Sequence, residues 1–201
     1  MHVTDGAKVC RDPALAHGPG SDLYARPRWY ACRTKARQEK SAARALAGRG
    51  LETYLPLYDR LRQWADRKKT VPWPLFSGYV FARFTMRDQH AVLSAPGVAT
   101  IVRVDGHPTP IPDGDIENVR RFVAALSASR AEPVRVRYPR LGERVTVASG
   151  PFTGVEGVVV RRGGRQRVII SVRGLRQSFA LTVEVGALEH DRFAVLDEES
   201  G

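Results

Sequence analysis

Cysteine is scarce in this 201-residue sequence, and the scarcity limits the chemistry that the chain can perform. Cys10 and Cys32 are too few for a disulfide framework and do not have the spacing of a metal site. The five histidines also lack metal-ligand spacing. No P-loop, dinucleotide-binding or Ser-His-Asp pattern is present, and Asp113 and Asp115 fit a helix N-terminus better than a catalytic pair. The sequence therefore predicts a cytoplasmic protein with no metal, no cofactor and no enzymatic activity.

Long apolar runs and acidic residues are also in short supply. No run approaches the ~20 apolar residues of a membrane span, and the N-terminus has no apolar signal-peptide core, so no membrane partner is expected. The chain has 21 Asp and Glu against 32 Lys and Arg, a formal net charge of +11. Residues 28–70 alone hold 12 Lys and Arg against 4 Asp and Glu, a net of +8. Such concentrated positive charge favours a nucleic-acid partner; a merely soluble basic surface is the alternative.

Residues 72–84 are the segment around which the rest of the chain is organised. Pro72 and Pro74 end the preceding secondary-structure element, and a strand-like run follows them. In that run Tyr79, Phe81 and Arg83 share one face of the pleat, whereas the residues between them point to the other face. This face carries more apolar area than a solvated face needs, so we expect an exposed binding surface. A sheet that is buried on both sides is the alternative.

The segments around this strand predict an α+β domain. Residues 1–27 show no sustained period and are expected to form a disordered tail. Between residues 28 and 126, strands and helices are expected in the order strand, helix, strand, strand, helix, strand, helix, which predicts an α/β sandwich with an antiparallel sheet flanked by helices. The expected strands are residues 28–34, 51–58, 72–84 and 98–104, and the expected helices are residues 35–49, 86–95 and 113–126.

The basic segment has two features that could contact phosphates. In the first expected helix, Arg37 and Arg44 share one face, and Lys35 lies at the helix entrance. This arrangement favours phosphate contacts over a merely solvated face. Residues 59–70 are expected to form a polar loop, in which Trp64 either stacks on nucleic-acid bases or holds a hairpin against the sheet.

A second, smaller domain is expected after a proline-containing linker at residues 127–139. From residue 140 to residue 197, apolar residues recur at every second position. Short expected strands alternate with glycine turns, as in a small β-barrel. Three glycines are expected at turns with positive φ, and one aromatic ring is expected to cover the core. These residues are Gly150, Gly154, Gly157 and Phe152.

Ordered motifs in both domains are similar to those of a known family. The motifs, in chain order, are Trp29-Tyr30, Glu39 with Leu46, Tyr54-Leu55-Pro56, the run from Pro74 to Phe81, Pro96-Gly97-Val98, and the run from Gly150 to Val158. The first domain resembles the N-terminal domain of NusG-type transcription elongation factors. The second domain resembles a KOW domain, which is an SH3-like barrel.

The resemblance implies a monomeric transcription elongation and antitermination factor that binds the clamp helices of RNA polymerase. It also implies contact with upstream or non-template DNA, and recruitment of a ribosomal protein or Rho by the KOW domain. The polymerase-binding positions that it implies are Tyr54, Phe76, Tyr79, Phe81 and Ile116. The candidate nucleic-acid contacts are Lys35, Arg37, Gln38, Arg44, Arg67, Lys68 and Lys69, and the KOW motif comprises Gly150, Phe152, Gly154 and Gly157.

Two departures from the family pattern favour a specialised member. Ser77 stands where a proline is usual, and residues 64–69 are more similar to specialised paralogs such as RfaH and the polysaccharide-operon antiterminators. The housekeeping factor, acting with Rho or the ribosome, is the alternative. RfaH-like proteins can refold the KOW domain into a helical hairpin, but the β-branched residues here favour a stable barrel. A ribosome- or RNA-binding KOW protein is disfavoured, because residues 140–197 hold 9 Lys and Arg against 6 Asp and Glu, a net of only +3.

Overall fold

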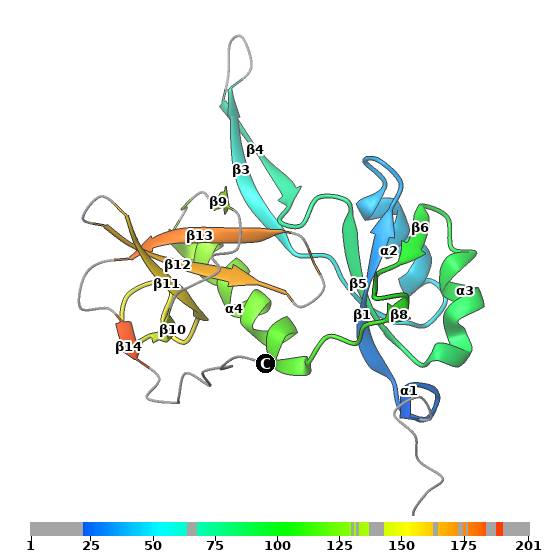
Figure 1. Ribbon diagram of the computed structural model, residues 1–201. Helices are drawn as coiled ribbons and strands as arrows, with labels where there is room; N and C mark the ends of the chain where they lie inside the picture. Colours follow the sequence, from blue (N-terminus) through cyan, green and yellow to red (C-terminus); the bar gives the residue numbers. More distant parts are fainter. Residues whose placement is uncertain are drawn as a thin grey trace, which may run out of the picture.

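Figure 1 shows the chain in a computed structural model, which describes residues 22–63, 68–129, 131, 133–136, 143–162, 165–172, 175, 177–183 and 188–190. An α+β domain and an all-β domain pack against each other, and the long helix α4 lies where they meet. A β-hairpin, formed by strands β3 and β4, projects away from both domains. The fold class predicted from the sequence is therefore confirmed.

The elements follow the expected order, with additional short strands. The N-terminal elements are α1 (Asp22–Ala25), β1 (Arg28–Thr34), α2 (Glu39–Ala47), β2 (Glu52–Tyr54), β3 (Leu57–Gln63), β4 (Lys68–Pro74), β5 (Tyr79–Phe84), η2 (Met86–Asp88), α3 (Gln89–Leu93), β6 (Val98–Ile101), β7 (Arg103–Val104), β8 (His107–Pro108) and α4 (Asp113–Ser129). The C-terminal elements are β9 (Val134–Val136), β10 (Glu143–Val147), β11 (Glu156–Arg162), β12 (Arg165–Ser171), β13 (Ser178–Val183) and β14 (Leu188–His190).

The main sheet of the N-terminal domain is buried on both of its faces. Its strand order is β2-β5-β1-β6, and all of its neighbouring strands are antiparallel. On one face, Val80 and Phe84 pack with residues of α2 and α3. On the other face, Phe81 belongs to a core shared with α4 and the barrel. The predicted alternation along β5 is confirmed, and of the two interpretations the buried one describes this structure.

Helix α2 begins four residues later than expected, because the chain turns first. Arg37 has a φ of 57°, which lies in the left-handed region that an α-helix cannot include. The helix starts at Glu39, whose carboxylate accepts a hydrogen bond from the Gly78 N–H at 2.8 Å. Gly50, with a φ of 76°, follows the helix as expected of a glycine after a C-terminus. Arg37 therefore lies in a turn and not on the predicted helical row.

The polar loop expected at residues 59–70 is instead part of an antiparallel hairpin. Strands β3 and β4 pair along their whole length and form a separate two-stranded sheet. Pro56 lies between β2 and β3, so the strand expected at residues 51–58 is divided between the main sheet and the hairpin. Prolines are tolerated in β4 because both strands of a two-stranded sheet have an open edge. Trp64 lies outside the described residues.

The C-terminal domain is the expected barrel, a strongly twisted antiparallel sheet with the strand order β14-β10-β11-β12-β13-β9 (Figure 1). The positive φ expected of its glycines is confirmed at Gly150 (86°) and Gly154 (78°). The expectation is wrong at Gly157, where glycine is needed for space. A Cβ atom there would lie 2.5 Å from Val168 Cγ1 and 2.7 Å from the backbone oxygen of Ile169.

Helix α4 links the two domains and extends further than expected. It continues to Ser129, and β9 adds three residues of the expected linker to the barrel sheet. Ile116 and Leu126 are buried, and Phe122 is buried between them. The Phe122 ring lies 6.2 Å from the ring of Phe152 in the barrel. No helix in the described part of the chain, α4 included, is long and apolar enough to cross a membrane.

Candidate functional site

The aromatic face of the main sheet is built by β2, β5 and the turn before β5. We define it as Tyr54, Phe76, Tyr79 and Phe81. The rings of Phe76 and Phe81 meet edge to face at 5.6 Å, and Tyr54 stacks on Phe81 at 6.3 Å. Such ring pairs are favourable beyond the apolar area that they bury. The structure thus brings together aromatic residues that are up to 27 positions apart in the sequence.

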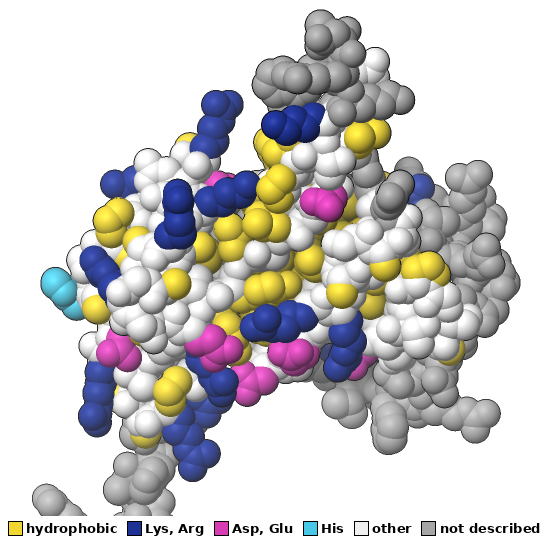
Figure 2. Space-filling model, turned by 180° about the vertical axis from the view of Figure 1, so that it is seen from behind, with side chains coloured by type: hydrophobic (Ala, Val, Ile, Leu, Met, Phe, Trp, Pro, Cys, Tyr) yellow, Lys and Arg dark blue, Asp and Glu magenta, His cyan; other side chains and the backbone are white. Residues whose placement is uncertain are grey.

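The protein's own second domain covers this face. The ring of Phe179, from β13 of the barrel, lies edge to face with Phe76 at 5.3 Å. Phe76, Phe81 and Ile116 are all 0% exposed. Figure 2 shows apolar side chains in a band where the two domains meet. The expectation of an exposed face was therefore wrong: its surplus apolar area is removed from water within the molecule, which the hydrophobic effect favours.

Polar contacts at the edge of the covered face fix how the domains dock. The Asn118 side chain on α4 donates to the Glu156 carbonyl at 2.7 Å and accepts from the Glu156 N–H at 2.8 Å. Arg121, one turn further along α4, donates to the Gly154 carbonyl at 3.1 Å. On the far side, Gln177 donates from Nε2 to the Ser77 carbonyl at 2.9 Å. We call these contacts the interdomain hydrogen bonds; three of the four end on backbone carbonyls.

A cluster of charged residues holds the first part of α4 against the sheet. The Arg120 guanidinium lies 4.3 Å from the centroid of Tyr54 and 3.2 Å from a Glu117 carboxylate oxygen. Arg83 on β5 pairs with Glu52 at 3.5 Å. Burial, and to a lesser extent Glu117, raises the pKa of Tyr54 to about 12, against the opposing effect of Arg120. The Tyr54 hydroxyl is therefore neutral at physiological pH, and its ring serves as an apolar and cation-binding surface.

Tyr79, like Tyr54, is only partly buried, whereas Phe76 and Phe81 are fully buried. Tyr79 is the first residue of β5, opposite Arg33 of β1. Its side chain can therefore be changed with less damage to the core than that of Phe81. The residues that complete the site, Asn118, Gln177 and Phe179, carry no sequence signal that distinguishes them from ordinary helix or strand positions.

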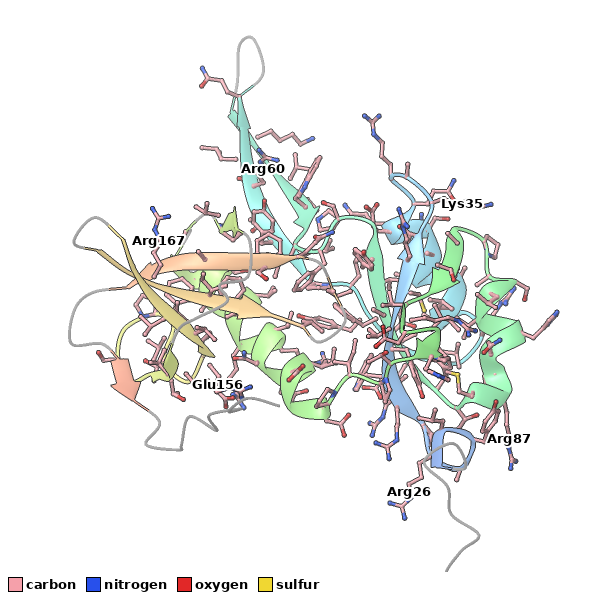
Figure 3. All side chains as sticks on the ribbon, viewed as in Figure 1. Arg26, Lys35, Arg60, Arg87, Glu156 and Arg167 are labelled. Carbon is pink, nitrogen blue, oxygen red and sulfur yellow. The ribbon has the colours of Figure 1, made fainter. Side chains whose placement is uncertain are left out.

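The candidate nucleic-acid contacts form an exposed basic surface around the start of α2 and along the hairpin. Lys35, Arg37 and Gln38 are exposed in the turn before α2, and Arg44 is exposed on the helix. In Figure 3, Lys35 and Arg60 lie toward the end of the molecule from which the hairpin projects, whereas Arg26 and Arg87 lie at the opposite end. Of the three further candidates, Lys69 is exposed on β4, Lys68 is described only by its place in β4, and Arg67 lies outside the described residues.

The fold and the site together define a class of protein. An α+β domain and a KOW-type barrel share one apolar core, and a basic surface lies beside it, which defines a two-domain protein of mixed α+β and all-β architecture. Its N-terminal half matches the family model described as "Transcription termination factor nusG" over residues 27–120.

Individual relatives agree with this match. The chain is 30% identical over 131 residues to the transcription termination/antitermination protein NusG of Deinococcus radiodurans, covering 56% of this chain and 67% of that protein. It is 26% identical over 167 residues to the protein of the same name from Thermus thermophilus, covering 73% and 90%. A solved structure described as "Domain interaction in Thermotoga maritima NusG" is 23% identical, with a TM-score of 0.44 and coverage of 83% and 98%. The chain belongs to the NusG family and is a transcription termination/antitermination factor.

Proposed function

We propose that this factor binds the clamp helices of RNA polymerase through its aromatic face, and that it must open before it can do so. The observation that supports this proposal is that the protein's own C-terminal domain covers the aromatic face. Phe76 lies in the run that matches the family's polymerase-binding motif, and it is covered by Phe179 of the barrel. A surface covered by a separate domain can be uncovered without unfolding the sheet that carries it.

Opening is feasible because the contact between the domains is partly polar. Three interdomain hydrogen bonds end on backbone carbonyls that water can solvate once the domains separate. Each bond contributes only a net ~0.5–1.5 kcal/mol, because water replaces the lost partner. The apolar part of the contact, the core that the two domains share, opposes opening and favours the closed arrangement at rest. A helical coiled coil with apolar side chains would compete for the same face.

We propose that the basic surface beside the aromatic face contacts upstream or non-template DNA. Lys35, Arg37 and Arg44 are exposed, and none of them forms an ion pair within the described residues. Side chains without an internal counter-ion can neutralise phosphates and release the DNA's counterions. Because the surface lies outside the interdomain contact, DNA contact does not require the aromatic face to be free.

We further propose that the freed barrel recruits a second protein, a ribosomal protein or Rho, and that the chain is a specialised, operon-specific member of its family. The closed arrangement supports a specialised, operon-specific role, because a factor that is closed by default acts only where something opens it. The partner of the barrel would meet Phe152 and its neighbours, which now pack on α4.

Polymerase binding should increase when the interdomain hydrogen bonds are removed. Asn118→Ala combined with Arg121→Ala removes three of the four bonds and leaves the aromatic face unchanged. We expect this variant to be retained on immobilised RNA polymerase more strongly than the wild type. The matched control is Ser127→Ala, because within the described residues the Ser127 hydroxyl bonds only to the Val123 carbonyl of its own helix.

The aromatic face itself is tested in that opened variant. Adding Tyr79→Ala should reduce its retention, because the change removes an aromatic ring from the proposed contact. Tyr79 is partly buried and can be truncated with less damage to the core than Phe76 or Phe81. Circular dichroism would verify that the triple variant remains folded. Equal retention of the opened variant with and without Tyr79→Ala would contradict the assignment of this face to polymerase.

A further inference from the structure

A pocket of about 220 Å³ lies at the base of the hairpin, between the hairpin and the barrel. Its walls include Tyr58 and Arg60 of β3, Trp73 of β4, Gln177, and Phe179 of β13. Both domains contribute walls, so the pocket exists only while they are docked. Its volume is below the ~300–1,000 Å³ of pockets that hold drug-sized ligands. It therefore fits a single small ring system better than an extended molecule.

The walls are suited to a flat aromatic ligand that carries a negative charge. Tyr58 and Trp73 are directly opposite each other on the two strands of the hairpin, and Phe179 closes the pocket from the barrel side. The Arg60 guanidinium lies 5.4 Å from the centroid of the Trp73 ring, which holds a delocalised positive charge at the pocket wall. Aromatic rings and arginine planes are the groups on which proteins stack nucleobases.

A buried hydrogen-bond acceptor in the same wall has no partner in the described part of the chain. Gln177 is 7% exposed, and its Nε2 is already engaged with the Ser77 carbonyl. Its Oε1 is buried and has no hydrogen-bond partner among the described residues. A buried acceptor of this kind requires a donor, and every nucleobase has an N–H on its edge.

The surroundings favour a base that belongs to a single strand. The hairpin continues outward from the pocket, and Lys69 is exposed on β4 two residues before Val71, which pairs with Arg60. A strand lying along this hairpin would place phosphates near Lys69 and Arg60 while one base turned inward. Within a duplex the bases are stacked and cannot enter such a pocket.

We propose that this pocket binds one nucleobase, with the phosphate of the same nucleotide beside Arg60. The inference rests on the closed arrangement that the proposed function also uses, and it adds a ligand that only the closed form can bind. By linkage, such a ligand stabilises the closed form as much as closure strengthens its binding. A free nucleotide and an unpaired base of a single strand share this chemistry, and the test below distinguishes them.

The test compares two single-stranded probes with the same number of phosphates, using the full chain without polymerase. One probe is an octamer of deoxyadenosine, and the other is an octamer of abasic sugar-phosphate. If a base enters the pocket, the first should bind about tenfold more tightly, because stacking on protein aromatic groups has about that effect per base. A 2-aminopurine in the octamer should also lose fluorescence on binding.

Variants assign the effect to the pocket. Trp73→Leu and Arg60→Ala should each reduce the difference between the two probes and the loss of fluorescence. Arg87→Ala removes the same charge as Arg60→Ala from the opposite end of the domain and should change neither (Figure 3). If Trp73→Leu does not fold, Arg60→Ala and the 2-aminopurine signal still decide the question. Competition by AMP at the octamer's own concentration identifies a free nucleotide as the ligand, and weaker competition identifies a single strand.

Three outcomes would overturn the proposal: equal binding of the two octamers, an unchanged difference in Arg60→Ala, or the same loss in Arg87→Ala. Closure is followed in the same samples by hydrogen exchange at the Glu156 N–H, whose acceptor Asn118 lies across the interface. Equal binding with a protected Glu156 N–H rejects the pocket alone and leaves the proposed polymerase function standing. An unprotected Glu156 N–H rejects the closed arrangement and the pocket together.

Discussion

Truncating Asn118 should shift the protein from its closed to its open arrangement without unfolding it. Asn118 makes two hydrogen bonds to the backbone of Glu156, at 2.7 and 2.8 Å. At a net ~0.5–1.5 kcal/mol each, their loss in Asn118→Ala should weaken closure by about 1–3 kcal/mol. That change corresponds to roughly a 5- to 150-fold shift in the ratio of closed to open molecules. Alanine has the highest helix propensity, so α4 itself should not be weakened.

The shift can be measured as a distance between the two domains. Spin labels at Arg87→Cys and Arg167→Cys place one probe on each domain (Figure 3). Cys10 is replaced by serine, and Cys32 can remain because burial raises its pKa to about 12 and keeps the thiol unreactive. The parent protein should give one narrow distance distribution. Asn118→Ala should add a second population that is longer and broader.

Ser127→Ala is the control for this experiment, since it removes a hydroxyl from α4 without touching the barrel. Its distance distribution should match that of the parent. The reasoning is refuted if Asn118→Ala keeps the narrow distribution alone, because the two hydrogen bonds would then contribute nothing to closure. It is also refuted if both variants open equally, because the effect would then come from α4 and not from the interface.

Three further predictions concern stability and DNA contact. Gly157→Ala should destabilise the barrel by about 1–3 kcal/mol through overpacking, whereas Gly114→Ala, where a Cβ meets nothing within 4 Å, should not lower the thermal midpoint. Burial raises the pKa of Cys32 from 9.0 to about 12, so the stability linked to its neutral thiol is complete below pH 9 and is lost as the pH rises toward 12. In urea unfolding, the advantage of the wild type over Cys32→Ala should shrink by about 1.4 kcal/mol per pH unit in that window, and a constant difference would contradict it. Lys35→Ala with Arg44→Ala should make the salt dependence of single-stranded DNA binding shallower by about 1.4 in log–log slope, and an unchanged slope in anisotropy titrations would remove these residues from the contact.

Much of the fold could be predicted from local pattern. The alternation of Tyr79 to Phe84 predicted a strand with two distinct faces, and the two cores now occupy those faces. The positive φ of Gly150 and Gly154 followed from turn chemistry. These predictions succeeded because each depends on residues close together in the chain, where steric limits and side-chain period act directly.

Errors arose where a local pattern has more than one solution. The polar segment around residues 59–70 reads as a loop, but cross-strand pairing with a partner segment makes it a hairpin. Arg37 fits a helical row, but the turn before α2 gives it a φ of 57°. Gly157 resembles the turn glycines, yet it is required by the neighbouring Val168 and Ile169, which only the folded sheet brings close.

By itself the sequence determined that this chain has an aromatic β-strand, a basic segment beside it and a separate small barrel, because period, charge and turn residues are local properties. Only the tertiary structure decided that the barrel lies on the aromatic face, with Phe179 against Phe76 and Asn118 bonded to Glu156. Apolar area indicates that a surface will be covered but not what covers it, since the hydrophobic effect has no direction. The choice between a partner and the chain's own domain depends on contacts between residues that are about 40 to 100 positions apart.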